Sequence, residues 1–458
     1  MATPGPKKGE RLVIEAGPWN ERAETCQTAD AVQLRVPGLI PGETARVEVT
    51  ARSKGGPVGW ARVVAIEAPG PHGAARRDAA CSVHEACGGC GLQYVREDKR
   101  LELLVAGQAA GLPSALGETL APPGEWIRSA GFAWRHKTVL LPAFEKGRLS
   151  LGGFARGTHK VVDQPDCEVL APRLREARAA LLSLLHPASV RGLLPAPPGQ
   201  EGARGLRSLI LRGNRSGGVL VTAVVRSQED LQGLSPLFER AVADGHLEGA
   251  FIQIMASSSD AVQGQEEPTL IAGVGQLDEV IAGVTLPVLP LAFFQVNPTV
   301  LEGIVHRLRS LSVGADVLLD AYCGVGALGI AVAAGLDPSP RVIGCDVVAS
   351  AVNAATNCAE HHGVDARYVT GTPLVLSDET ASVLLVDPPR KGCSAAELDA
   401  LLSSRPPTVL YVSCSVKSLA RDAQRLLDAG YKPMGLWPAD MLPQTAHLEW
   451  IAAFEHRP

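Results

Sequence analysis

The chain lacks several features, and each absence excludes a class of protein. Its 458 residues contain no apolar run long enough to span a bilayer, so we expect no membrane partner. Its start, MATPGPKKGE, has two lysines but no apolar stretch behind them, which is not the pattern of a signal peptide. Ten cysteines are too few for a disulfide scaffold in a chain of this length. We therefore expect a cytoplasmic protein whose cysteines are reduced thiols, metal ligands or catalytic groups.

The chain also lacks an excess of positive charge. A net charge of −5 and a pI of about 6.2 argue against a protein that binds nucleic acid through an overall basic surface. Basic residues can still gather locally, as they do in segment 128–160. Such a stripe can bind phosphates and stack bases, or it can be an ordinary solvated hairpin face. Its basic and aromatic residues are Arg128, Phe132, Trp134, Arg135, Lys137, Phe144, Lys146, Arg148, Phe154, Arg156 and Lys160, with one acid, Glu145.

The length suggests two to four domains, and a hydrophobic content of 46% is enough to bury a full core. Residues 1–70 contain short alternating runs such as RLVIEAG and ARVEVTAR, which predict a small five-stranded β-barrel of the oligonucleotide-binding type. Residues 71–285 combine strand-like runs such as SLILRG with helical spacing at 172–185, and a Pro/Gly-rich loop is expected at 187–205. This indicates a central α+β domain.

Residues 286–458 have a different pattern. The strand-like runs VLLDAYCG, RVIGCDV, SVLLVDPP and TVLYVSC alternate with helical stretches. This alternation predicts an α/β domain with a doubly wound, Rossmann-like parallel sheet. The run HLEWIAAFE predicts one further strand.

A glycine motif follows the first strand of this region. LLDAYCGVGALG contains Gly324, Gly326 and Gly329, and Asp346 ends the next predicted strand. Glycines let the backbone approach an adenosine-bearing ligand, and the acid can accept hydrogen bonds from ribose hydroxyls. The pattern fits NAD and S-adenosylmethionine equally well, and it also fits a tight turn without a ligand.

Asp387 favours the second of these cofactors. It ends the apolar strand in SVLLVDPPRKGC, where two prolines stop the strand and leave the carboxylate at the edge of the sheet. A methyltransferase needs such a group to fix a planar base beside the sulfonium methyl, whereas NAD enzymes have no particular need for it. Simple termination of the strand is the alternative.

Cys414, in YVSCSVKSLARD, lies where a strand runs into a helix. It is either a nucleophile or a small buried side chain. A thiolate that adds to C6 of uracil makes C5 electron-rich enough to take the methyl group of S-adenosylmethionine, and a base must then remove the C5 proton. Glu449, in QTAHLEW, is a candidate base, although it could also be a surface glutamate.

A cysteine cluster precedes these motifs in the chain. Cys81, Cys87 and Cys90 have the spacing C-x5-C-x2-C, and Cys167 is the nearest candidate for a fourth ligand. Four thiolates suit an iron–sulfur cluster or structural zinc, and the spacing does not choose between them. The remaining cysteines are interpreted as core or incidental residues: Cys26, Cys323, Cys345, Cys358 and Cys393.

The motifs FFQVNP, DAYCGVGALG, DPPRKG, YVSC…LARD and HLE occur in the order found in RNA uracil-C5 methyltransferases. The chain resembles this family over essentially its whole length. The N-terminal strands, with PGLIPGE, resemble the family's TRAM domain, and the cysteine cluster resembles the 4Fe-4S site of the branch that acts on 23S ribosomal RNA.

The resemblance implies S-adenosylmethionine-dependent methylation of uridine C5, with Cys414 as the nucleophile and Glu449 as the base. It implies RNA as the partner, with ribosomal RNA favoured and transfer RNA possible, and no obligate protein partner. It further implies two sets of binding residues. The cofactor and uracil crevice would involve Gln295, Tyr322, Gly324, Gly326, Asp346 and Asp387, and the 4Fe-4S cluster would bind Cys81, Cys87, Cys90 and Cys167.

Two hypotheses from other classes stand beside this one. An NAD-linked oxidoreductase is supported by the glycine motif alone. A non-catalytic RNA-binding assembly factor would keep the barrel and the cluster without the chemistry. The joint presence of Cys414, Asp387 and Glu449 favours the methyltransferase.

Overall fold

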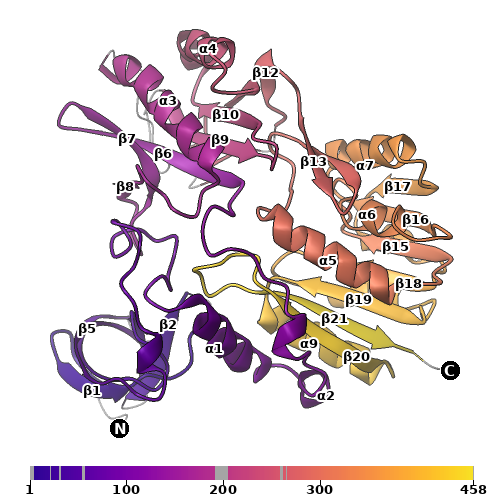
Figure 1. The fold of residues 1–458 in the computed structure, drawn as a ribbon, viewed down its shortest axis with the longest axis horizontal. Coiled ribbons are helices and arrows are strands. Elements are labelled where there is room, and N and C mark those ends of the chain that lie inside the picture. The colour runs from indigo at the N-terminus through magenta and orange to yellow at the C-terminus, as the bar shows by residue number, and fades with distance from the viewer. Residues whose placement is uncertain are drawn as a thin grey trace.

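Three large β-sheets organise the chain in the computed structural model, and each is formed by a different stretch of the sequence (Figure 1). The structure describes residues 5–20, 22–29, 32–53, 57–190, 205–257, 261–264 and 266–456. Within this part of the chain, no helix is both long and apolar enough to cross a membrane.

The N-terminal sheet has five strands in the order β1-β4-β5-β3-β2 and curls around its own apolar core. Alternation in the sequence sets this core, because Leu34, Val36 and Val47 are fully buried while the residues next to them are more exposed. The small barrel-like domain expected from the sequence is therefore observed. Its strands are β1 (Arg11–Glu15), β2 (Glu24–Ala29), β3 (Val32–Pro37), β4 (Thr44–Arg52) and β5 (Val58–Ala68).

A long connection leads from the barrel to the second sheet. It carries the cysteine cluster, two short 3-10 turns and helix α1 (Glu97–Ala109), which buries Leu101, Leu104 and Val105 against the C-terminal sheet. The N-terminal half of the chain therefore contributes to the core of the C-terminal half. The other elements of this connection are η1 (Gly73–Ala75), α2 (Ser114–Gly117) and η2 (Pro123–Glu125).

The central sheet has seven strands in the order β12-β11-β10-β9-β6-β7-β8. Helices α3 (Pro172–Val190) and α4 (Gln228–Ala243) pack on it through residues such as Leu181 and Phe238. The predicted helix at 172–185 is confirmed and extends into the expected loop, of which residues 191–204 lie outside the described part of the chain. The strands are β6 (Lys137–Glu145), β7 (Arg148–Phe154), β8 (Val161–Asp163), β9 (Leu206–Gly213), β10 (Val219–Val225), β11 (Gly249–Ile254) and β12 (Thr269–Gly273).

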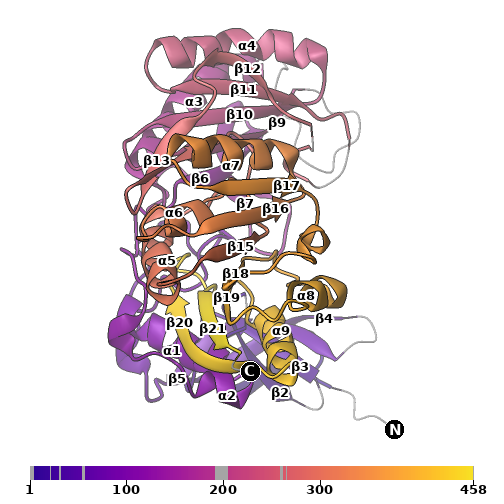
Figure 2. The ribbon, with the colours of Figure 1, turned by 90° about the vertical axis from the view of Figure 1, so that its right-hand side faces the viewer.

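The hairpin β13 (Leu277–Ile281) and β14 (Val284–Val288) leads to the C-terminal sheet, whose order is β17-β16-β15-β18-β19-β21-β20 (Figure 2). Its first five strands are parallel, and β21 and β20 are antiparallel to their neighbours. The strands are β15 (Val317–Ala321), β16 (Arg341–Asp346), β17 (Ala366–Thr370), β18 (Val383–Val386), β19 (Thr408–Ser413), β20 (Lys432–Ala439) and β21 (Glu449–Glu455).

Both faces of the C-terminal sheet are covered by helices. Successive strand residues point to opposite sides, so Leu318 belongs to one core and Leu319 to the other. This explains why the strands are near-continuous apolar runs, and it gives the doubly wound α/β fold that the sequence predicts. One face carries α5 (Pro298–Leu311), α6 (Gly329–Ala333) and α7 (Ala349–His361), and the other carries α8 (Ala395–Leu401) and α9 (Val416–Asp428), with η3 (Pro373–Leu376) before β18.

Candidate active site

Four candidate residues lie at the carboxyl ends of neighbouring parallel strands. Tyr322 follows β15, Asp346 ends β16, Asp387 follows β18 and Cys414 follows β19. These strands are adjacent in the order β16-β15-β18-β19, so their carboxyl ends share one edge of the sheet. In open α/β sheets this edge is where ligands bind.

Glu449 lies opposite Cys414 on a pair of antiparallel strands. Ser413 of β19 pairs with Trp450 of β21, so the next position in this register sets Cys414 against Glu449. Cys414 is half-buried and Glu449 is buried, which makes Glu449 a core residue rather than a surface glutamate. Burial raises the pKa of the Cys414 thiol to about 11, and the negative charge of Glu449 acts in the same direction.

Asp387 and Arg390 complete this group of charges. Burial raises the pKa of Asp387 to about 7. Burial also raises the pKa of Glu449 well above its ordinary value, with the charge of Asp387 adding to the effect and the Arg390 guanidinium opposing it. The same guanidinium opposes the upward shift of the Cys414 pKa. Sequence analysis did not single out Arg390, although it directly follows Asp-Pro-Pro.

The loop that leads into Glu449 is held by helix α1. The fully buried guanidinium of Arg100 forms an ion pair with Asp440. Gln108 accepts a hydrogen bond from the indole N–H of Trp450, at 3.0 Å. Separating the partners of a buried ion pair is strongly unfavourable. These contacts therefore fix the loop before β21 and, with it, the position of Glu449, the first residue of that strand.

The turn after β15 brings the backbone close to the strand edge. Tyr322, Gly324 and Gly326 have φ values of 63°, 55° and 77°, a region that glycine tolerates and other residues rarely adopt. A side chain at position 326 would also collide with Ile330. Asp346 accepts the N–H of Gly324 at 3.0 Å and a second backbone N–H at 2.9 Å. Each carboxylate oxygen has a second lone pair that can accept a ribose hydroxyl.

Asp320, inside β15, is a buried carboxyl group that sequence analysis missed. Its Oδ2 accepts the N–H of Gly329 at 3.1 Å. Burial raises its pKa to about 8, and the charges of Asp387 and Asp346 add to the shift. An acid inside the apolar run VLLDA was the signal that could have revealed it.

Gln295 lies in the loop in front of α5. Asn297 caps this helix with its side-chain oxygen and Pro298 takes the first helical position, so the motif FFQVNP is a helix start. Gln295 is partly buried, whereas Phe293 is 66% exposed. The loop therefore presents an aromatic ring to solvent.

A groove of about 1100 Å³ runs between the N-terminal sheet, the cysteine cluster, the central sheet and the strand edge. It shares Arg22, Ala446 and His447 with a cavity of about 370 Å³ that contains Cys414. The groove is therefore continuous with the surroundings of the thiol. It is positively charged in a chain of net charge −5, because its charged lining consists of one acid, Glu24, and the arginines Arg22, Arg62, Arg135, Arg156 and Arg390.

The structure divides the basic stripe at 128–160. Arg135, Phe154 and Arg156 line the groove, whereas Arg148 forms an ion pair at 3.4 Å with an aspartate of β8. Trp134 is only 4% exposed, so it can serve neither of the two roles considered for the stripe, base stacking or a solvated face. The backbone N–H groups of the residues on both sides of it donate to the carbonyls of Glu168 and Val169.

Cys81, Cys87, Cys90 and Cys167 line one small cavity of about 50 Å³. The side chain of Gln164 donates to Cys87 Sγ at 3.0 Å. Burial raises the pKa of Cys90 to about 11 and also raises the pKa of Cys81 and of Cys167. Among the described residues, no group of three or more His, Cys, Asp or Glu side chains has the arrangement of a site for a metal ion. The four cysteines nevertheless share one cavity.

The cysteine cluster is hydrogen-bonded to the loop before Glu449. The N–H of Leu92 donates to the carbonyl of Gln444 at 3.0 Å, and the neighbouring Gln93 accepts the N–H of Cys81 at 3.1 Å. A short bonded path thus joins the cysteine cavity to the strand edge.

The other cysteines agree with their interpretation where they are described. Cys323, Cys345, Cys358 and Cys393 are buried. The side chain of Cys26 lies outside the described residues.

Comparison with known proteins adds two findings, although no protein-family model matches the chain. An uncharacterized RNA methyltransferase of Thermosynechococcus vestitus is 34% identical over an alignment of 438 positions, which covers 91% of this chain and 92% of the relative. An uncharacterized RNA methyltransferase of Parasynechococcus marenigrum is 30% identical over an alignment of 462 positions, which covers 98% of this chain and 96% of that relative.

The second finding is structural. The solved structure of the Pyrococcus abyssi tRNA (uracil-54, C5)-methyltransferase, in complex with S-adenosyl-L-homocysteine, matches with a TM-score of 0.73 at 24% identity. The match covers 96% of this chain and 99% of that one. It confirms the fold class, a Rossmann-like α/β domain with a small N-terminal barrel-like domain.

Proposed function

The chain belongs to the RNA methyltransferases, and we propose that it transfers a methyl group from S-adenosylmethionine to C5 of a uridine in RNA. One observation carries the proposal: a groove lined by arginines shares lining residues with a cavity that contains Cys414, and the strand register sets Cys414 opposite the buried Glu449. Arginines bind the phosphates of RNA. A thiol beside a carboxyl group supplies the nucleophile and the base that reaction at a pyrimidine ring requires.

In the proposed reaction, the thiolate of Cys414 adds to C6 of the uracil ring and produces an enolate. C5 then attacks the methyl group on the sulfonium of S-adenosylmethionine. The C–S bond breaks, and the remainder of the cofactor leaves as S-adenosylhomocysteine. Glu449 removes the C5 proton, and the electron pair of that C–H bond expels the thiolate and restores the ring. A raised pKa suits Glu449 to accept a proton from carbon, and the positive charge of Arg390 favours the thiolate.

Asp387 is proposed to hold the uracil edge. With a pKa of about 7 it is present both as a carboxylate, which accepts the ring N3–H, and as a carboxylic acid, which donates to a ring carbonyl. The proposed site of S-adenosylmethionine is the same strand edge. Support comes from the left-handed turn, from the lone pairs of Asp346 and from the ligand in the Pyrococcus abyssi structure. Its residues would be Gln295, Tyr322, Gly324, Gly326, Asp346 and Asp387.

We also propose that Cys81, Cys87, Cys90 and Cys167 hold a 4Fe-4S cluster. Four thiols around one cavity match the donor set of such a cluster and also that of structural zinc, and the resemblance of the cysteine spacing to the 23S ribosomal RNA branch favours the cluster. The cluster would be structural, because four protein ligands leave no open coordination site. Iron and sulfide in the anaerobically prepared protein would support this assignment, and stoichiometric zinc would overturn it.

Ribosomal RNA of the 23S type is the proposed substrate, with transfer RNA as the second candidate. The first rests on three proposed units that occur together: a TRAM-like barrel at 1–70, a central domain with the cysteine cluster at 71–285 and a methyltransferase domain at 286–458. The second is supported by the substrate named for the Pyrococcus abyssi enzyme.

The test is methyl transfer to unmodified ribosomal and transfer RNA, with 5-methyluridine measured by mass spectrometry of nucleosides. The wild type is expected to modify one of the two RNAs, and Cys414→Ala neither. RNA containing 5-fluorouridine is expected to form a covalent adduct at Cys414, because fluorine cannot leave as a proton does. Normal methylation by Cys414→Ala would refute the thiolate role, and no methylation of either RNA by the wild type would favour the assembly factor.

A further inference from the structure

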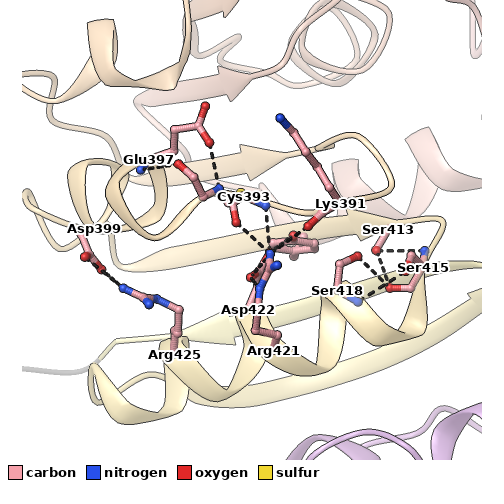
Figure 3. A network of polar contacts seen from close by, with 12 residues as sticks. Lys391, Cys393, Glu397, Asp399, Ser413, Ser415, Ser418, Arg421, Asp422 and Arg425 are labelled. Carbon is pink, nitrogen blue, oxygen red and sulfur yellow. Dashed lines mark hydrogen bonds and ion pairs between the residues drawn. The ribbon is translucent and has the colours of Figure 1, made fainter.

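Asp422, inside helix α9, is a fully buried carboxylate that takes no part in the proposed reaction. It makes three hydrogen bonds in the network of Figure 3. Its Oδ2 accepts the hydroxyl of Tyr411 at 2.6 Å and the N–H of Cys393 at 3.0 Å, and its Oδ1 accepts Arg421 Nε at 2.7 Å. Burying a leucine at such a position would carry a smaller free-energy penalty than burying a carboxylate. The carboxylate therefore does more than fill the core.

Arg421 and Asp422 together hold one turn, residues 389–393. Arg421 Nη2 donates to the carbonyls of Lys391 and Cys393, at 3.0 and 2.8 Å. Gly392 lies directly against the pair, with φ at 73°, and a Cβ on it would be 2.5 Å from the carboxylate of Asp422. Only glycine allows so close an approach.

This turn carries charged residues of the proposed site. Arg390 lies within it and lines the groove, and Asp387 lies two residues before it. Tyr411 is in β19, three residues before Cys414, and α9 begins two residues after Cys414. Asp422 therefore ties the turn to the chain on both sides of the thiol.

We propose that Asp422 is a positioning residue, which keeps the turn with Arg390 at a fixed place beside Cys414. The inference rests on the proposed function and extends it to residues that do not touch RNA. The turn and its approach carry Asp387, Arg390 and Lys391, and of these Arg390 affects the thiol most strongly, ahead of Asp387. The other charged or titratable groups that face Cys414 are Glu449 from β21 and, around the cavity, His447, Arg22 and Arg35.

The first measurement needs no RNA. The rate at which iodoacetamide alkylates Cys414 is followed against pH by peptide mass spectrometry in the full-length protein. Asp422→Asn is expected to shift this profile upward by about half a pH unit to one unit, which is a three- to tenfold lower rate at a given pH. The reason is that a displaced Arg390 no longer favours the thiolate. Asp399→Asn is the matched control, because it removes only the exposed pair with Arg425 between α8 and α9, at 2.7 Å (Figure 3).

The second measurement is the rate of adduct formation with RNA containing 5-fluorouridine. We expect it to fall about tenfold in Asp422→Asn while the affinity for S-adenosylmethionine changes less than twofold, because Asp346 bonds to Gly324 and to the backbone after β16, away from Asp422. The double variant Asp422→Asn/Arg390→Gln is expected to form the adduct at nearly the same rate as Arg390→Gln alone, since Asp422 acts through Arg390.

An alkylation profile of Asp422→Asn that coincides with the wild type, or full additivity with Arg390→Gln, would overturn the proposal. If Asp422→Asn does not fold, Tyr411→Phe decides by the same measurements, with a smaller shift in the same direction expected. A wild type that never traps the fluorinated RNA refutes the proposed function instead, and the alkylation profiles still decide the role of Asp422.

Discussion

Asp320→Asn tests the electrostatics of the strand edge through stability. The carboxyl group is 1% exposed and has a pKa of about 8, whereas an unfolded aspartate has 3.8. A carboxyl whose pKa is raised by folding contributes stability that is fully present below the unfolded value and is lost as pH rises through the folded value. Over this window the folded chain binds one proton more than the unfolded chain, so the wild type loses about 1.4 kcal/mol per pH unit through this group.

Between pH 6 and pH 8 the loss from Asp320 alone amounts to about 2.5 kcal/mol, and asparagine, which does not titrate, removes it. The assay is urea unfolding of wild type and variant at both pH values. Relative to the wild type, Asp320→Asn is expected to gain about 2.5 kcal/mol on going from pH 6 to pH 8, whatever its stability at pH 6. Asp316→Asn, which changes an exposed residue just before the same strand, is expected to keep the wild-type dependence. An unchanged dependence in Asp320→Asn would refute the reasoning.

Three further predictions concern the base, the groove and the cysteines. Glu449→Gln is expected to lower turnover about 10²- to 10⁴-fold and to accumulate a covalent adduct with ordinary RNA on denaturing gels, because the C5 proton is not removed; free RNA alone would contradict its role as the base. Arg156→Gln is expected to weaken RNA binding and to lower the salt dependence of the RNA affinity by about one counterion. Arg240→Gln, on the exposed face of α4, is the control and is expected to leave both unchanged. Equal effects of the two variants would argue against the groove as the RNA-binding surface. Cys87→Ser is expected to lower the iron content per chain and the visible absorbance, while Cys358→Ser, in the core, keeps both; unchanged iron in Cys87→Ser would exclude it as a ligand.

The fold could be predicted from the sequence because its signals are local. Apolar runs ending in DPP and SC mark β18 and β19, and the doubly wound sheet follows from their alternation with helices. The burial of Trp134 could not be predicted, because it depends on hydrogen bonds to segments distant in the chain.

The residues that hold the site in place could not be predicted for the same reason. Arg100 and Asp440 are 340 residues apart in sequence, and neither belongs to a motif. Asp422 is visible in LARD, but its partners in the 389–393 turn become apparent only in the folded chain. Sequence analysis therefore found residues proposed to act on the substrate and missed those that hold them in place.

The position of β21 has a consequence for folding during synthesis on the ribosome. This strand is inserted between β19 and β20, although it is made after both of them. The thiol at 414 thus leaves the exit tunnel before its carboxyl partner at 449, and it stays without that partner until the late strand is seated. A nascent chain halted between these two points would carry the proposed nucleophile without the proposed base, so the order of synthesis delays the assembly of the proposed site until the sheet is finished.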